Sequence, residues 1–100
     1  MAKSKQEIVD GIKAHIQKEN SGYKNWYVGI SEDARDRLSN GHGVPKENAW
    51  WILRETSSTS VAREVEEYFV NTLGSNGAPG GGSDKSNQVY AYKKTSVTKP

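Results

Sequence analysis

The sequence predicts one α+β domain, in which three helices pack against a small three-stranded antiparallel sheet in the order α-β-α-β-α-β. Its length of 100 residues suits one hydrophobic core and leaves no room for a second. Apolar residues recur with helical spacing in some segments and with strand spacing in others, and the two kinds of segment alternate along the chain. We expect the domain to cover residues 1–94, followed by a disordered tail over residues 95–100.

The first helix is predicted from Ser4 to Lys18. Ser4 and Glu7 have the spacing of a capping box, and isoleucines recur at every fourth position after them. The turn-prone stretch from Asn20 to Gly22 should end this helix. We therefore expect an amphipathic helix that buries its isoleucine face.

The first strand is predicted from Trp26 to Ile30, a run of aromatic and β-branched residues. Strand alternation sends Tyr27 and Gly29 to the same face. Because glycine has no side chain, that face should carry a phenolic hydroxyl beside an open patch of backbone.

A short second helix is predicted to follow Ser31 and to reach about Asn40. Ser31 suits its N-cap, acidic residues follow in its first turn, and Gly41 suits its C-terminal cap. Arg35 and Arg37 flank its apolar stripe. The default interpretation of both arginines is that they are solvated helix charges.

The second strand is predicted from Ala49 to Arg54, a run rich in β-forming residues. Neighbouring residues of a strand point to opposite faces, so Trp50 and Trp51 should separate. We expect both rings in the core; the alternative is that one is exposed for stacking on a nucleobase.

The third helix is predicted to begin within Thr56–Ser60, where several side chains suit an N-cap, and to end at Leu73, with Gly74 as its stop. On a helical wheel Glu66 borders the apolar face, whereas Glu67 lies opposite it. A charged run such as this one is usually the wet face of a helix. Its border position makes Glu66 the better candidate for a functional carboxylate.

Glycine and serine dominate residues 74–87, so we expect a flexible Gly/Ser loop there. The last strand is predicted from Gln88 to Lys93, where aromatic and apolar residues return.

The composition limits the compartment and the partners. The chain has no cysteine, which excludes a disulfide-linked partner and a thiolate metal site and indicates a reducing, cytoplasmic environment. Its start lacks the apolar stretch of a signal peptide, and no run of about eighteen apolar residues occurs, so we expect neither export nor insertion in a membrane. A formal net charge of +2 is too small to indicate nucleic-acid binding by itself.

The segment from Tyr27 to His42 resembles the signature of GIY-YIG nucleases. Tyr27-Val28-Gly29 is similar to the YIG strand of that family. Arg37, ten residues after Tyr27, stands where the family has the arginine of its first helix. His42 is similar to the histidine that trails this arginine.

Two later segments extend the resemblance. The third predicted helix is similar to the family's second helix, in which a glutamate precedes an apolar residue by four positions, as Glu66 precedes Val70. The family's first strand, which carries the GIY tyrosine, does not precede Tyr27, but Gln88-Val89-Tyr90 is similar to it. We hypothesise a circular permutation in which the last strand pairs with the Tyr27 strand and Tyr90 replaces the family's first tyrosine.

The resemblance implies a metal-dependent endonuclease that hydrolyses phosphodiester bonds of DNA. Its catalytic residues would be Tyr27, Arg37, His42 and Tyr90. Arg37 would stabilise negative charge on the phosphate, and Tyr27 or Tyr90 would orient or deprotonate the attacking water. Glu66 would hold Mg²⁺ or Mn²⁺, ions that keep several waters and need few protein ligands.

Two other functions stay open at this point. A non-catalytic nucleic-acid-binding module of the same fold would hold phosphates with basic residues, among them Lys24, Arg35 and Arg54. A protein-interaction domain would use an exposed tryptophan or the Gly/Ser loop. In either case Tyr27 would be an ordinary half-buried aromatic residue of a strand.

Overall fold

The last strand of the chain occupies the middle of the sheet. The computed structural model describes residues 4–20, 22–44, 49–77, 85–95 and 98. In this part of the chain, β1 (Trp26–Ser31), β2 (Trp51–Glu55) and β3 (Gln88–Lys93) form an antiparallel sheet in the order β1-β3-β2. β3 therefore has a paired strand on each side.

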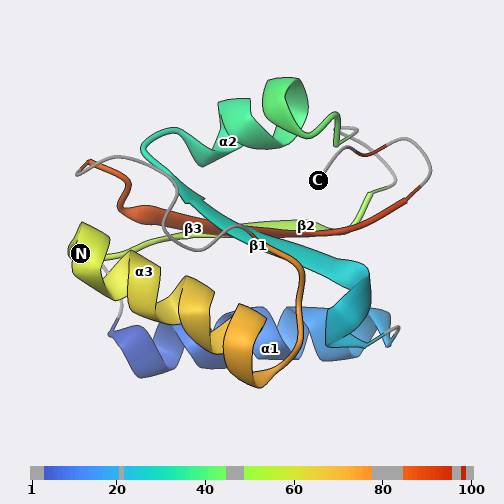
Figure 1. Ribbon diagram of the computed structural model, residues 1–100, viewed down its shortest axis with the longest axis horizontal. Coiled ribbons are helices and arrows are strands. Elements are labelled where there is room, and N and C mark those ends of the chain that lie inside the picture. The colour runs from blue at the N-terminus through green and yellow to red at the C-terminus, as the bar shows by residue number, and fades with distance from the viewer. Residues whose placement is uncertain (1–3, 21, 45–48, 78–84, 96–97, 99–100) are drawn as a thin grey trace.

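Two helical layers enclose this sheet (Figure 1). α1 (Lys5–Glu19) and α3 (Thr59–Glu67) cover one face, and the short α2 (Ala34–Asp36) covers the other. The α+β class and the alternating order of helices and strands predicted from the sequence are thus confirmed. In the described residues, no helix is long and apolar enough to cross a membrane.

Both ends of α1 are fixed as its sequence predicts. The Ser4 hydroxyl accepts a hydrogen bond from the Glu7 backbone N–H at 3.2 Å, and the Glu7 carboxylate accepts one from the Ser4 backbone at 3.2 Å, which completes the capping box. Asn20 ends the helix in the left-handed conformation. Glu19 then ties the helix to the sheet, because its carboxylate accepts hydrogen bonds from the Trp26 indole and the Lys93 ammonium.

The alternation of β1 separates two apolar clusters. Its residues Trp26, Val28 and Ile30 face α1 and α3, and all three are buried. Tyr27 faces α2 instead, where it packs against a second cluster around Ala34. The face assignments predicted for β1 are confirmed.

The second helical segment differs from the prediction at both ends. Ser31 is the last residue of β1, and Asp33 is the N-cap, since its carboxylate accepts the Asp36 backbone N–H at 3.2 Å. After α2 the chain continues as a π-helical turn, η2 (Arg37–Gly41). Gly41 lies inside this turn, and the residue with positive φ is Gly43. The predicted cap at Ser31 was therefore wrong by two residues and the predicted cap at Gly41 by one, since the C-cap is His42.

The third helix ends where the sequence predicts. Ser58 caps α3 by accepting the Val61 backbone N–H at 3.3 Å. α3 continues as a second π-helical turn over Tyr68–Thr72, and Gly74 follows with a φ of 84°. Burial of Ala62, Val65 and Phe69 confirms the predicted apolar face.

The beginning and end of the predicted Gly/Ser loop are packed. Residues 78–84 lie outside the described residues, but Asn76 pairs with β1 through hydrogen bonds to Val28 and Trp26 at 2.8 and 2.9 Å. The side chains of Ser75 and Ser86 are buried. The flexibility expected of residues 74–87 stays a prediction; at the two ends of this segment, backbone pairing compensates for the lack of apolar side chains.

β2 begins at Trp51, two residues later than predicted. Trp50 precedes the strand, and 39% of its surface is exposed; its ring packs edge-on against His15 of α1. Trp51 is half-buried on the other face, beside α2. The two rings separate as predicted, but the expectation that both belong to the core was wrong for Trp50.

Candidate active site

Three tyrosines and one histidine gather on the face of the sheet that α2 covers. Tyr27 of β1 lies directly opposite Tyr92 of β3, and their ring centroids are 5.4 Å apart. Tyr90, two residues before Tyr92, projects on the same side, 6.4 Å from the Tyr27 centroid. The His42 ring, from the end of η2, lies 4.7 Å from that of Tyr27. We call these four side chains the tyrosine–histidine cluster.

Both ring nitrogens of His42 contact tyrosine hydroxyls. The Tyr90 hydroxyl lies 2.7 Å from Nε2, and the Tyr92 hydroxyl lies 3.2 Å from Nδ1. The Arg37 guanidinium acts on the same phenol, because it lowers the pKa of Tyr90 against the effect of burial. Tyr90 is therefore the tyrosine on which both the histidine and the arginine act.

The π-helical turn explains why Arg37 and His42 can both act on Tyr90. In an α-helix with 3.6 residues per turn, residues five apart point in clearly different directions. In η2 the His42 N–H donates to the Arg37 carbonyl at 2.9 Å, an i to i+5 bond that widens the turn. The wider turn places the two side chains on one side, toward Tyr90.

Gly41 leaves room for the arginine. A Cβ at this position would come within 3.0 Å of the Arg37 Cδ and 3.6 Å of its Cγ. Although Arg37 is exposed as a whole, its side chain lies along the η2 backbone on its way to Tyr90. The glycine predicted as a helix stop thus has a different role, which is to let Arg37 approach.

Glu66 approaches from the opposite helical layer. It is only 2% exposed, and its Oε1 has no hydrogen-bond partner among the described residues. Burial raises the pKa of this carboxyl to about 7, with Arg63 lowering it and Glu67 raising it. A buried carboxylate without a partner is costly, so Glu66 differs from an ordinary residue of a wet helix face.

The charges of Glu66 and Arg37 both act on the phenols. Burial raises the pKa of Tyr27, the Glu66 carboxylate raises it further, and the Arg37 guanidinium lowers it. Burial raises the pKa of Tyr90 to about 12, the charge of Tyr27 adds to this, and Arg37 opposes it. Glu66 belongs to α3 and Arg37 follows α2, so the two charged residues come from opposite faces of the sheet that carries the phenols (Figure 1).

The three basic residues predicted to bind nucleic acid do not share one surface. Lys24 is exposed in the turn before β1. The Arg54 guanidinium donates to the Leu53 carbonyl at 2.8 Å and lies near Gly11 of α1, across the sheet from α2.

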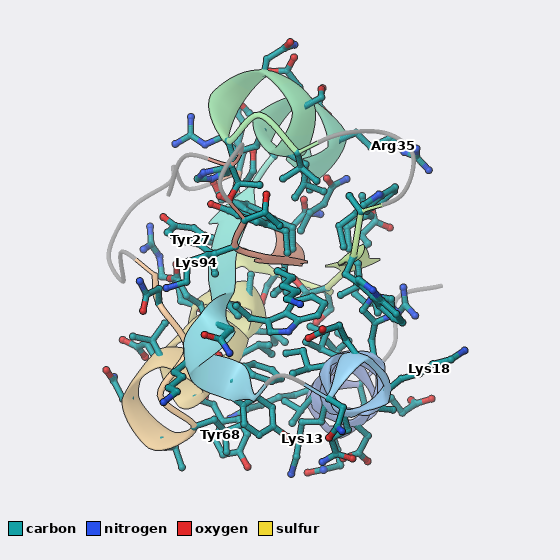
Figure 2. All side chains as sticks on the ribbon, turned by 90° about the vertical axis from the view of Figure 1, so that its right-hand side faces the viewer. Lys13, Lys18, Tyr27, Arg35, Tyr68 and Lys94 are labelled. Atoms are coloured by element: carbon teal, nitrogen blue, oxygen red, sulfur yellow. The ribbon has the colours of Figure 1, made fainter. Side chains whose placement is uncertain are left out.

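Arg35 is the third of these residues, and it belongs to the other flank of α2. Its guanidinium lies over the Trp51 ring, 5.8 Å from the centroid. Figure 2 shows Arg35 and Tyr27 on opposite sides of the view. Beside Arg35 is a half-open cleft of about 520 Å³ between α2 and β2, which the tyrosine–histidine cluster does not line. Its lining residues are Asp33, Arg35, Asp36, Leu38, Ser39, Val44 and Trp51.

The residues present can supply the protein part of a divalent-cation site, but only one carboxylate of it. Among the described residues, no group of three or more histidine, aspartate or glutamate side chains is placed to hold a metal. Glu66, with its unpartnered buried oxygen, fits an ion that binds one or two carboxylates and otherwise keeps water and substrate phosphate as ligands. Mg²⁺ and Mn²⁺ meet that description.

Tyr92 is the member of the cluster that we did not select from the sequence. The signal was present, because strand alternation places residues 90 and 92 on the same face. Alternation does not reveal that His42 packs against Tyr92.

Comparisons with models of protein families, with curated proteins and with solved structures find no match. The pairing of β1 with β3, in which Tyr27 and Tyr90 lie on adjacent antiparallel strands, is the pairing that the permutation hypothesis requires. The class defined by fold and site is a small α+β domain with a tyrosine–histidine–arginine cluster on its sheet.

Proposed function

We propose that this protein is a cytoplasmic, metal-dependent endonuclease of the GIY-YIG type, circularly permuted, that hydrolyses phosphodiester bonds of DNA. The observation that supports this most is that His42 bonds to the Tyr90 hydroxyl, the Arg37 charge lowers the pKa of the same phenol, and Tyr27 lies next to it. Each of these residues is a candidate on the sequence alone. Their convergence is what the proposal requires.

Arg37 is suited to bind the phosphate. Phosphodiester hydrolysis places extra negative charge on the non-bridging oxygens in the transition state, and a fixed cation beside them lowers that barrier. Arg37 is exposed, its side chain lies along Gly41, and its charge acts on Tyr90. It can therefore contact a phosphate beside the phenol.

Tyr90 and Tyr27 are suited to handle the attacking water. With its pKa raised to about 12, Tyr90 is neutral at physiological pH in the protein alone, so it orients a water in that state. To act as a base it needs additional positive charge nearby. Glu66 would hold Mg²⁺ or Mn²⁺ there, and a bound divalent ion supplies charge that neutralises phosphate oxygens and acidifies nearby hydroxyls.

The test is cleavage of supercoiled plasmid and of branched DNA, with and without Mg²⁺ or Mn²⁺. Arg37→Ala and Glu66→Ala should each reduce cleavage by about 10² to 10³-fold, the effect of losing one charge-stabilising group. Matched controls are Arg54→Ala, on the face of the sheet that α1 covers, and Glu67→Ala, on the exposed side of α3. Both controls should cleave nearly as wild type.

Two results would contradict the proposal. Cleavage that survives both Arg37→Ala and Glu66→Ala would show that the reaction occurs elsewhere. Metal-independent, salt-sensitive binding of DNA with no cleavage would instead identify a non-catalytic binding module.

A further inference from the structure

The half-open cleft between α2 and β2 lies on the same face of the sheet as the tyrosine–histidine cluster. Trp51 lines this cleft, and its cross-strand partner on β3 is Tyr92, which is also the partner of Tyr27 on β1. Adjacent strands are about 4.8 Å apart, so the backbones of Trp51 and Tyr27 are separated by roughly 10 Å. That separation is about three nucleotides at the ~3.4 Å spacing of a stacked DNA strand. A strand bound at the cluster can therefore reach the cleft.

The cleft has the size and the wall of a site for a flat ring. Its volume of about 520 Å³ is within the range of small-molecule pockets, which combine an apolar wall with a few polar groups. The half-buried Trp51 ring and the buried side chains of Leu38 and Val44 supply the apolar wall. An aromatic side chain in such a wall can stack on any nucleobase, because every base has a π-face.

Arg35 is placed to serve the same nucleotide. Its guanidinium lies over the Trp51 ring, 5.8 Å from the centroid, which shows that this ring accepts a flat group from the α2 side. Arg35 is exposed, so its guanidinium can leave the indole for the phosphate of a nucleotide whose base takes its place.

The charges of the cleft favour a base over a phosphate inside it. Asp33 and Asp36 line the cleft together with Arg35, two negative charges against one positive charge. A phosphate is repelled by this excess, whereas a base is neutral and carries N–H groups that a carboxylate accepts. The two Oδ1 atoms already accept the Asp36 N–H and the Asn40 amide, but a carboxylate accepts more than one hydrogen bond.

We propose that this cleft binds one unpaired nucleobase of the DNA strand, stacked on Trp51, with Arg35 at the phosphate of the same nucleotide. The inference rests on the endonuclease function proposed above and names its substrate class. That class is DNA with unpaired bases, as in a single strand, a gap or a branch. A base within a paired duplex would first have to be flipped out of its stack, which costs free energy.

Trp50 and Trp51 provide a matched pair of variants. Trp50 lies on the α1 side of the sheet, where its ring packs against His15, and it is the more exposed of the two. Loss of one base–aromatic stack weakens binding by about 5 to 150-fold. Trp51→Leu should therefore bind a labelled oligothymidine that much more weakly than wild type in EDTA. Trp50→Leu should bind it as wild type does.

An abasic oligonucleotide separates base binding from phosphate binding. It has the phosphates of the oligothymidine but no bases, so wild type should bind it about 5 to 150-fold more weakly. Trp51→Leu should lose most of this preference for the strand with bases. Equal affinity of wild type for the two strands would overturn the proposal, and so would a wild type that binds neither.

A fluorescence measurement leaves Trp51 in place and so does not depend on the folding of its variant. In Trp50→Phe the remaining tryptophans are Trp51 and the fully buried Trp26. A base stacked on Trp51 should quench its emission, so oligothymidine should quench Trp50→Phe saturably and the abasic strand should not. Quenching of wild type that disappears in Trp50→Phe would place the contact on the α1 face and contradict the proposal.

Cleavage assays distinguish failure of this inference from failure of the proposed function. We expect wild type to cleave branched DNA faster than a linear, fully paired duplex. If it binds a single strand through Trp51 but cleaves no DNA, the endonuclease proposal fails and the base site stands. If both substrates are cleaved equally fast, by wild type and by Trp51→Leu, the base site fails and the endonuclease proposal stands.

Discussion

The Tyr90 hydroxyl lies directly over the α-carbon of Gly29, its partner across β1 and β3. A Cβ at position 29 would come within 2.5 Å of that hydroxyl oxygen and 2.7 Å of the carbon that bears it. The glycine after Tyr27-Val28 is therefore required for space and not for backbone conformation, since its φ is not positive. It is the open backbone patch that the sequence predicts beside Tyr27.

Gly29→Ala should therefore displace Tyr90 from His42 and Arg37. We expect a loss of stability of about 1 to 3 kcal/mol, the usual cost of an added methyl group in a packed site. DNA cleavage should fall well beyond what that loss of stability explains. Urea denaturation and plasmid cleavage measure the two effects.

Gly11→Ala is the control for this substitution. Gly11 lies inside α1, and a Cβ added there would lie 3.8 Å from the Arg54 Nε, an ordinary van der Waals contact. Alanine should stabilise the helix there by about 0.5 to 1 kcal/mol and leave cleavage unchanged. Equal cleavage by both variants would disprove the close approach at Gly29.

The raised pKa of Glu66 predicts a pH-dependent stability. Between pH 4.5 and about 7 the folded protein keeps a proton on this carboxyl that the unfolded chain has lost. This proton stabilises the folded protein. Its contribution is complete below pH 4.5, falls by about 1.4 kcal/mol for each pH unit above that, and is lost as pH rises through about 7. Glu66→Gln should remove this dependence and be the more stable protein at pH 8, by roughly 3 kcal/mol.

Urea denaturation of wild type and Glu66→Gln at several pH values measures how the difference between their unfolding free energies changes with pH. That change is the contribution of the Glu66 carboxyl. Glu67→Gln, on the exposed side of α3, should follow wild type. A wild type and a Glu66→Gln protein with parallel stability curves would refute the prediction.

Divalent metal should stabilise the protein through the same carboxylate. An ion that binds only the folded state adds about 2.7 kcal/mol at a hundred times its Kd. We expect Mg²⁺ or Mn²⁺ to raise the Tm of wild type at pH 8 and to leave that of Glu66→Gln unchanged. An equal shift in both proteins would place the ion elsewhere.

The positions of Arg35 and Arg54 predict different effects on DNA binding. Arg35 lies on the α2 side of the sheet, as the tyrosine–histidine cluster does, whereas Arg54 lies against α1 on the opposite side. Arg35→Ala should make the slope of log affinity for DNA against log salt concentration shallower by about one, the value for one phosphate contact. Arg54→Ala should bind as wild type; the reverse result would move the binding surface to the α1 face.

Much of the fold could be predicted because its signals are local. The Ser4 capping box, the alternation within β1 and the Gln88–Lys93 strand each depend on residues less than eight positions apart. The same local reasoning failed at Ser31 and Gly41, where neighbouring residues suit the same capping role and the surrounding structure selects among them.

The candidate site could be predicted only as a set of residues. Tyr27, Arg37 and Tyr90 were selected through a family pattern, and alternation alone places Tyr92 beside Tyr90. That His42 bonds to both Tyr90 and Tyr92, across 48 and 50 residues of chain, follows from no pattern in the sequence.

By itself, the sequence determined the order of helices and strands, the faces of β1 and the chemical types present at the site. Only the tertiary structure decided that β3 is the central strand, that the buried Glu66 Oε1 has no hydrogen-bond partner among the described residues, and that a π-helical turn brings Arg37 and His42 to act on Tyr90. The physical reason is the separation along the chain over which each effect acts. Propensity and periodicity act between near neighbours in the chain, whereas burial and hydrogen-bond pairing are set by segments that meet only after the sheet has formed.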